Sequence, residues 1–428
     1  ICRRTEKVSP SFFPIKEIKM ANRDLIIDHR PKKEGKIKHS LNSVRRYFSV
    51  PANVLLVIFA AVLLVFTIYP LVSLVQSTFT VSISEIVFGL IPGSFTTAWW
   101  NRVFASTRSK TYFWKPLLNS LEMSLLASVI AILYGGIVAF LITRTDIKAK
   151  KFLSSIFVFP YIRPSWTLAT FWQNFFQNPD IGTGVGGMLY NLFHISVPSG
   201  MVYGIVPCAV VLGRHYAPFA YILIGGILRN RDANLEEAAT ILKASRWKIT
   251  RKITLPIVMP SIISTFLLVF SSSRSAYAVP QYLGGGQYVL TTYRKQFTNK
   301  GFYGQAYIFA IVRIVLGVGI LLLNQWFTGK RKNFTTVTGK SGQVSYIKLR
   351  GWNYPLITFA LESLCVRSGD YSSRTLQYWI SRTETDAGNG LVGILFEPQV
   401  WLAFRNSILL SVSCCLIAGT LGILIGYA

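Results

Sequence analysis

Acidic side chains are scarce in this sequence. Its 428 residues include 17 Asp and Glu against 45 Lys and Arg, which gives a formal net charge of +28. The few carboxylates lie mostly in loops, and neither paired carboxylates nor a grouping of Ser, His and Asp occurs. Acid–base and nucleophilic catalysis therefore have no support, and we expect that the chain is not an enzyme.

Metal-binding side chains are also few. Four histidines are scattered and five cysteines show no ligand spacing, namely His29, His39, His194, His215, Cys2, Cys208, Cys365, Cys414 and Cys415. A metal cluster therefore has no support. Gly339-Lys340-Ser341 resembles the end of a phosphate-binding loop, but Phe334 stands where that loop needs a glycine. We therefore expect no metal, no cofactor and no ATP site in this chain.

Long apolar stretches are abundant instead. The chain is 51% hydrophobic with a mean hydropathy of +0.42, and several stretches are long enough to cross a bilayer. This composition predicts an all-α fold, a polytopic transmembrane helical bundle. In a soluble protein the positive charge would suggest nucleic-acid binding, but here Lys and Arg flank the apolar spans and set their orientation. We expect membrane lipids, and no nucleic acid, among the partners.

Hydropathy divides the chain into three regions. Residues 1–50 form a basic cytoplasmic tail, of which 1–19 precede a plausible start at Met20 and are left out of the fold. Residues 51–332 hold six predicted spans, at about 52–75, 117–142, 152–175, 201–228, 257–279 and 306–327. Residues 333–428 are predicted to hold a linker, a short seventh span over Tyr354–Val366 and an eighth span from Asn406. The polar stretch 360–385 departs from a normal span, as a sequence error would explain.

Spans two and eight share a sequence pattern. Asn119-Ser120, Ser124 and Gly135 recur at one fixed offset as Asn406-Ser407, Ser411 and Gly422. This recurrence indicates an internal duplication, so that residues 333–428 begin a second half like the first and are cut early in it.

The segment Leu235–Pro256 is short, polar and basic, and it lies between spans four and five. Asn234 can cap a helix whose Glu237 reaches back to it, and acidic residues in that first turn suit the helix dipole. The helix is predicted to stop near Lys243. Ser245 is predicted to cap a second short helix, which Leu255-Pro256 ends. Lys and Arg are dense here and absent from the loop 177–200, which places this segment inside and that loop outside.

The residues of this segment carry a family pattern. Glu237-Ala238-Ala239, Ile253 and Leu255-Pro256 reproduce the spacing E-A-A-x3-G-x9-I-x-L-P. This resembles the EAA loop of ABC importer permeases that depend on a binding protein. Lys243 stands in place of the usual glycine, and a left-handed residue with a side chain costs roughly 1 kcal/mol there. An ordinary pair of connecting helices, in which Glu237 only caps, is the alternative.

The resemblance implies a multi-pass permease of the type I ABC importer kind in the cell inner membrane. Its partners would be a cytoplasmic ABC ATPase dimer and a periplasmic or lipoprotein solute-binding protein. ATPase coupling would fall to Glu236, Glu237, Ala238, Ala239, Lys243, Ile253, Leu255 and Pro256. The duplication resembles fused iron(III)-type permeases, which supply the second permease half in cis.

The substrate stays open among several classes at this stage. Iron(III) is the best interpretation, and thiamine and organophosphonate importers share the fused arrangement. A secondary transporter and a non-transporting membrane scaffold are alternatives of another class. Arg274, Arg313 and Ser273 lie within spans five and six and are candidates for a translocation path, because a charge at membrane depth costs at least about 2.5 kcal/mol and tends to face a cavity. Snorkelling to the interface is the alternative for the two arginines.

Overall fold

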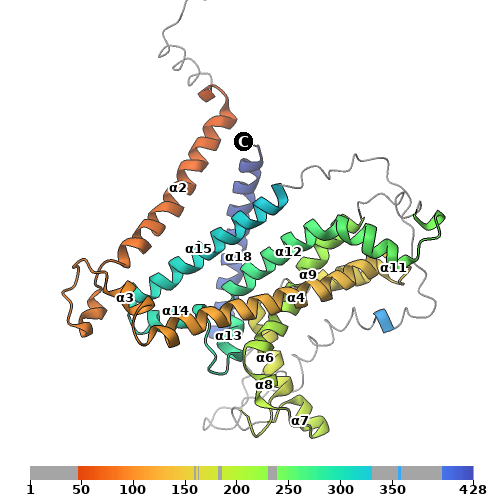
Figure 1. Ribbon diagram of the computed structural model, residues 1–428. Helices are drawn as coiled ribbons and strands as arrows, with labels where there is room; N and C mark the ends of the chain where they lie inside the picture. Colours follow the sequence, from red (N-terminus) through yellow and green to blue (C-terminus); the bar gives the residue numbers. More distant parts are fainter. Residues whose placement is uncertain are drawn as a thin grey trace, which may run out of the picture. The chain divides into compact units, whose positions relative to one another are not determined.

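The computed structural model describes residues 47–158, 161, 163–181, 186–229, 239–329, 355–357 and 398–427. These residues form helices and loops, with an isolated bridge between Thr80 and Phe95 and no strand among them (Figure 1). The chain divides into two compact units, Thr67–Ile408 and a second made of Ile1–Phe66 with Leu409–Ala428. Most of the predicted tail and linker and most of the seventh span lie outside the described residues.

Six helices of the described chain are long and apolar enough to cross a membrane. They are Pro51–Ser77, Lys110–Arg144, Ser199–Arg229, Trp247–Ser275, Tyr303–Phe327 and Trp401–Leu424. They correspond to predicted spans one, two, four, five, six and eight. The all-α, polytopic membrane architecture predicted from composition is therefore confirmed.

The third predicted span, about 152–175, was wrong as a single helix. The structure has two shorter helices instead, α5 (Lys150–Val158) and α6 (Ser165–Phe176). Pro164 precedes α6 with an extended ψ of 139°. A proline ring removes a backbone donor and disfavours helix in the residue before it, so an apolar run with two prolines breaks there.

The packed centre of the larger unit is the pair α4 (Lys115–Arg144) and α9 (Ile205–Arg229). Glycines let the two backbones approach closely. A Cβ at Gly135 would lie 2.3 Å from the carbonyl oxygen of Ala217, and one at Gly213 would lie 2.7 Å from Cβ of Ile130. Small residues at such crossings are the usual device of membrane helix pairs.

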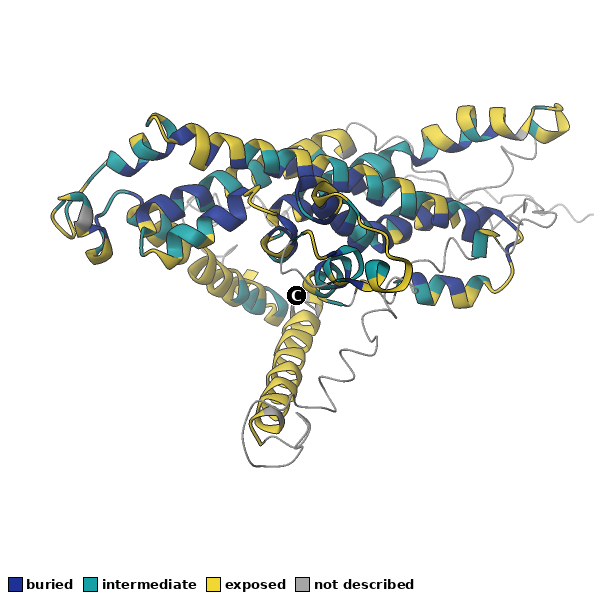
Figure 2. Ribbon diagram, turned by 90° about the horizontal axis from the view of Figure 1, so that it is seen from below, coloured by how far each residue is buried: buried dark blue, intermediate teal, exposed yellow. Residues whose placement is uncertain are grey.

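A third long helix, α12 (Leu255–Ser275), packs on both members of this pair and on α15 (Tyr303–Gly329). Buried side chains gather where these helices meet, as the dark segments of Figure 2 show. The cluster at the end that leads to the EAA-like segment includes Val138, Tyr221 and Val258.

The opposite end of the larger unit is closed by short helices. These are η1 (Ile83–Phe88), α3 (Ala98–Phe104), η2 (Lys110–Trp114), α13 (Ala278–Leu283) and α14 (Leu290–Asn299). Glu85 is fully buried there, and its carboxylate accepts hydrogen bonds from the N–H groups of Ser82 (3.0 Å) and Gly304 (2.9 Å). Gly304 lies in the first turn of α15, so Glu85 caps that helix. Burial raises the pKa of Glu85, although the two N–H donors and Arg102 act in the opposite direction.

The glycine-rich loop after α13 makes a tight turn. Gly285 and Gly286 have φ of 55° and 84°, a region that side chains rarely adopt. Two short helices, α7 (Met188–Phe193) and α8 (Ser199–Val202), follow α6, and Gly285 lies against Tyr203, the residue directly after α8.

Candidate functional site

The EAA-like segment is partly described. Of the predicted coupling residues, Ala239, Lys243, Ile253, Leu255 and Pro256 lie in described stretches. Glu236, Glu237 and Ala238 lie outside the described residues, as does Asn234, their predicted cap. We call the described part, Ala239–Thr254, the elbow.

The elbow begins with a tightly closed helix end. Lys243 has φ of 56°, in the left-handed region. The N–H of Lys243 donates to the carbonyl of Thr240 (2.9 Å), and the N–H of Ala244 donates to the carbonyl of Ala239 (3.0 Å). These two bonds are the Schellman pattern, with Lys243 at the position that usually holds glycine. The predicted stop near Lys243 is therefore confirmed, and the turn forms without glycine.

The second part of the elbow is a helix that starts at a capped end. The hydroxyl of Ser245 accepts a hydrogen bond from the N–H of Lys248 (3.4 Å), as predicted for an N-cap. The short helix α11 (Arg246–Ile249) continues into η4 (Thr250–Thr254), which is a π-helix, and then into α12.

The predicted break at Leu255-Pro256 was wrong, because one helix runs over Trp247–Ser275. The N–H of Leu255 donates to the carbonyl of Thr250, five residues earlier, so the turn before Pro256 is wider than an α-turn. A proline ring clashes with the carbonyl four residues earlier in a plain α-helix. The widened turn makes room for the ring, and the helix passes through.

Three large apolar side chains of the elbow are exposed. Ile241 and Leu242 are each 81% exposed and Trp247 is 73% exposed. Exposed apolar residues gathered on one small feature often mark a contact with a partner. None of these three was among the predicted coupling residues, although an Ile-Leu pair and a Trp inside a basic, polar segment were a usable signal.

The two predicted path arginines come together at the far end of α12. Nη2 of Arg274 donates to the carbonyl oxygen of Arg313 on α15 (3.1 Å), and Nη2 of Arg313 donates to that of Ser275 (3.4 Å). Arg274 is 2% exposed, so it lies between two helices and does not snorkel. Ser273 is also buried, one residue before it. Sequence spacing could not predict this pairing, since it joins two different helices.

Unsatisfied donors surround this arginine pair. Nε and Nη1 of Arg274, Nε of Arg313 and the hydroxyl of Ser273 are buried and have no hydrogen-bond partner among the described residues. Gly317 leaves room for the guanidinium, since a Cβ there would lie 3.4 Å from Nη2 of Arg274. Buried donors without partners carry a desolvation cost, which an acceptor from outside the chain would remove. The described residues include no group of three His, Cys, Asp or Glu that could hold a metal ion.

Comparison with known proteins gives relatives of one kind. A ferric transport system permease of Haemophilus influenzae, itself a provisional assignment, is 23% identical over 339 residues, covering 74% of this chain and 51% of the relative. The molybdenum transport system permease of Escherichia coli K12 is 26% identical over 220 residues, covering 50% and 92%. The chain thus spans about half the length of the ferric relative.

A solved structure supports the fold. One chain of a bacterial ABC transporter involved in the import of alginate, an acidic polysaccharide, aligns with a TM-score of 0.50 at 17% identity. The alignment covers 70% of this chain and all of that one. Residues 131–333 match the family of binding-protein-dependent transport system inner membrane components, a range that includes the elbow, α12 and α15. The family model, the relatives and the fold therefore agree, and over residues 131–333 this chain is similar to the inner-membrane components of binding-protein-dependent transport systems.

Proposed function

We propose that this chain is the transmembrane permease of an ATP-driven ABC importer in the cell inner membrane. A cytoplasmic ATPase dimer hydrolyses ATP and docks on the elbow, and a solute-binding protein delivers substrate at the opposite side. The observation that carries this proposal is the continuity of the elbow with α12, which packs on α4, α9 and α15. A displacement of the elbow is therefore transmitted through one helix into the packed core.

The docking face in this proposal has a polar and an apolar part. The polar part is the set predicted from the sequence, Glu236, Glu237, Ala238 and Ala239, of which the first three lie outside the described residues. Ile241, Leu242 and Trp247 supply apolar area that docking would remove from water, at about 25 cal/mol per Å². Lys243 holds the turn that follows Leu242, while Ile253, Leu255 and Pro256 lie in the continuous helix Trp247–Ser275 that leads into the bundle.

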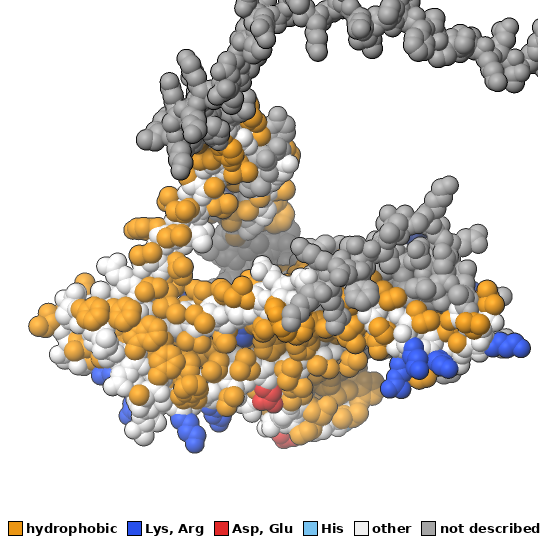
Figure 3. Space-filling model, turned by 45° about the horizontal axis from the view of Figure 1, so that its top comes forward, with side chains coloured by type: hydrophobic (Ala, Val, Ile, Leu, Met, Phe, Trp, Pro, Cys, Tyr) orange, Lys and Arg blue, Asp and Glu red, His pale blue; other side chains and the backbone are white. Residues whose placement is uncertain are grey.

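The orientation of the bundle follows from charge. Basic residues are dense around the elbow, and cytoplasmic loops carry the excess of Lys and Arg. Figure 3 shows Lys and Arg towards both ends of one face, with hydrophobic side chains between them, so the orientation rests on the density of basic residues around the elbow and their absence from the loop 177–200. We therefore assign the elbow to the cytoplasm and the end with α13 and α14 to the outside. A second permease half, in cis or as another chain, completes the pore.

Docking can be tested with two matched charge insertions. Ile241→Glu on the elbow should weaken binding of the ATPase subunit at least tenfold, because it buries a charge in the contact. Ile83→Glu is the control, since Ile83 is 78% exposed on η1 at the opposite end. Both variants should insert normally into membranes. Equal ATPase binding by both would contradict the docking proposal, and so would unchanged transport after Glu237→Leu.

For the substrate, we propose iron(III), which the ferric relative favours. A second candidate is an oxyanion, because the arginine pair and Ser273 offer unsatisfied donors and no described acidic group joins them. If these cationic donors line the path, iron(III) would cross only as an anionic complex. Uptake of labelled iron(III), molybdate and sulfate by vesicles with the complete transporter separates the two. Loss of molybdate uptake in Arg274→Gln, with no iron uptake in the parent protein, would reject iron(III).

A further inference from the structure

A second basic site lies at the elbow end of the bundle, away from the arginine pair. The ends of α4 and α9 and the start of α5 surround a cavity of about 500 Å³. Lys150, Lys151 and Arg229 line it together with the hydroxyl groups of Thr143 and Ser154, and no acidic residue is among the lining residues. This cavity has no part in the coupling or transport proposed above.

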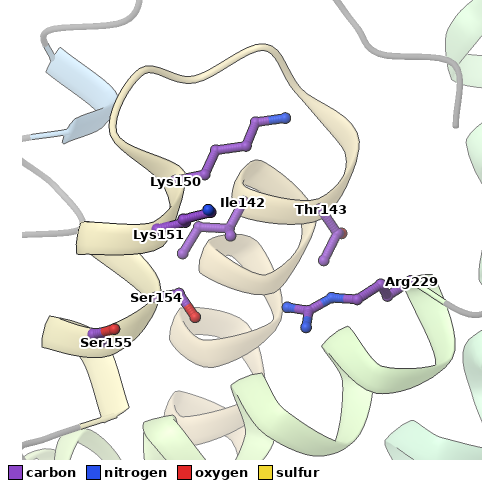
Figure 4. Close-up of a pocket in the computed structure, with 7 residues that line it drawn as sticks. All are labelled: Ile142, Thr143, Lys150, Lys151, Ser154, Ser155 and Arg229. Carbon is purple, nitrogen blue, oxygen red and sulfur yellow. The ribbon is translucent and has the colours of Figure 1, made fainter.

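The cations of this cavity converge on one space. Figure 4 shows the guanidinium of Arg229 extending from α9 towards α5, on which Lys151 and Ser154 lie. Ser154 is held in place by the hydroxyl of Tyr221 at 2.8 Å. Two basic groups and a fixed hydroxyl around one open space are the donor set that recognises a phosphate oxygen cluster.

The charge balance of the cavity favours a monovalent anion. The three basic side chains face the C-terminal ends of α4 and α9, which contribute about −0.5 each, and the N-terminal end of α5, which contributes about +0.5. Asp146 acts on Lys150 and offsets one further charge. A net charge of roughly +1.5 remains, which suits a phosphodiester better than a multiply charged ion.

An apolar surface leads from the cavity towards the membrane interior. Gly226 and Ile222 precede Arg229 by three and seven residues, which puts them on the same face of α9. Ile222 is 48% exposed, and Phe152, next to Lys151 on α5, is 58% exposed. A soluble anion would leave this apolar surface uncovered, whereas acyl chains attached to a phosphodiester would cover it.

We propose that the cavity between α4, α5 and α9 binds the headgroup of an anionic phospholipid of the inner leaflet. Basic pockets between membrane helices on the cytoplasmic side are suited to such headgroups. The leaflet follows from the orientation assigned above, but the binding itself does not depend on transport. A bound lipid would bridge three helix ends and fix the base from which the elbow departs.

Lipid retention by the purified chain tests this proposal. Native mass spectrometry of the purified chain, equilibrated with equal amounts of phosphatidylglycerol and phosphatidylcholine, should show mainly phosphatidylglycerol adducts. Lys151→Gln with Arg229→Gln should weaken that binding about tenfold or more, since each cation near the surface contributes to lipid attraction. Lys248→Gln with Arg251→Gln is the control, because it removes the same charges from exposed positions outside the cavity.

The outcomes separate the proposal from its alternatives. Equal loss in both double variants would reduce the effect to general surface charge and overturn the site. Displacement of the lipid by millimolar inorganic phosphate would identify a soluble-anion site instead. Unchanged lipid binding together with lost ATPase binding in the cavity variant would identify a protein contact. Thermal unfolding of each variant shows that it is folded, and failure of the elbow test leaves this result unaffected.

Discussion

Helices α4 and α18 (Pro398–Tyr427) carry the same residue pattern in different surroundings. Both are 30 residues long. In the most apolar 18-residue stretch that includes α4, 44% of the residues are buried. In the matching stretch of α18, 0% of the residues are buried within the described chain. The serine hydroxyls at matching positions make the same local bond, Ser120 to the carbonyl of Pro116 (2.7 Å) and Ser407 to that of Ala403 (2.8 Å). The local helix is therefore independent of burial.

The two helices differ in the long-range hydrogen bonds that the shared residues make. In α4, Ser120 also accepts a hydrogen bond from the N–H of Leu290 (2.9 Å), and Asn119 donates to the carbonyl of Tyr288 (2.9 Å). In α18 the counterparts Asn406 and Ser407 are exposed. The shared residues are thus those that hold α9 and α14 in place, and their recurrence predicts equivalent partner helices for α18.

The largest expected difference concerns the matched glycines. Gly135→Leu should destabilise the bundle by about 3 kcal/mol or prevent assembly, because its side chain would meet the backbone of Ala217, which cannot move aside. Gly422→Leu should change little, since nothing described lies within 4 Å of that position. Thermal unfolding in detergent measures both. An equal loss in the two variants would remove the distinction between the helices.

The matched serines should give a smaller difference. Ser120→Ala leaves the buried N–H of Leu290 without its acceptor, which should cost about 1–3 kcal/mol. Ser407→Ala removes an exposed local bond and should stay within about 0.5 kcal/mol. Urea or thermal unfolding of each variant against the parent protein provides the comparison. An equal cost in both variants would contradict the expected effect of burial on this hydrogen bond.

The matched asparagines should give the smallest difference. Asn119→Ala removes a hydrogen bond at the surface of the loop before α14, at a cost of about 1 kcal/mol. Faster hydrogen–deuterium exchange over residues 287–293 should report it, whereas Asn406→Ala should leave that segment unchanged. Equal exchange in both variants would show that the loop is held by other contacts.

Hydropathy was enough to predict most of the spans, because apolar runs of this length have few other uses. It failed at span three, where Pro160 and Pro164 interrupt an apolar run, and at Pro256, where a widened turn lets the helix continue. The prediction for span three underestimated how strongly its prolines disrupt a helix. The prediction for Pro256 overestimated that effect. At Pro256 the widened turn over 250–254 accommodates the ring, and no single-residue preference encodes that turn.

The candidate site was predictable where it depends on local sequence. The stop at Lys243 and the cap at Ser245 each need neighbouring residues alone. The reciprocal bonds of Arg274 and Arg313 and the exposure of Ile241 and Trp247 depend on how helices far apart in the chain meet. Those features needed the structure.

The widened turn over 250–254 also sets the spacing of the buried residues along this helix. The buried residues Ile249, Thr254 and Val258 are spaced by five and then four, so one extra residue is absorbed without turning the inward side away. Deleting any one residue there would return ordinary spacing and keep Ile249 and Val258 facing inward. Related chains that are one residue shorter at this point would therefore share the geometry, although their alignments carry a gap.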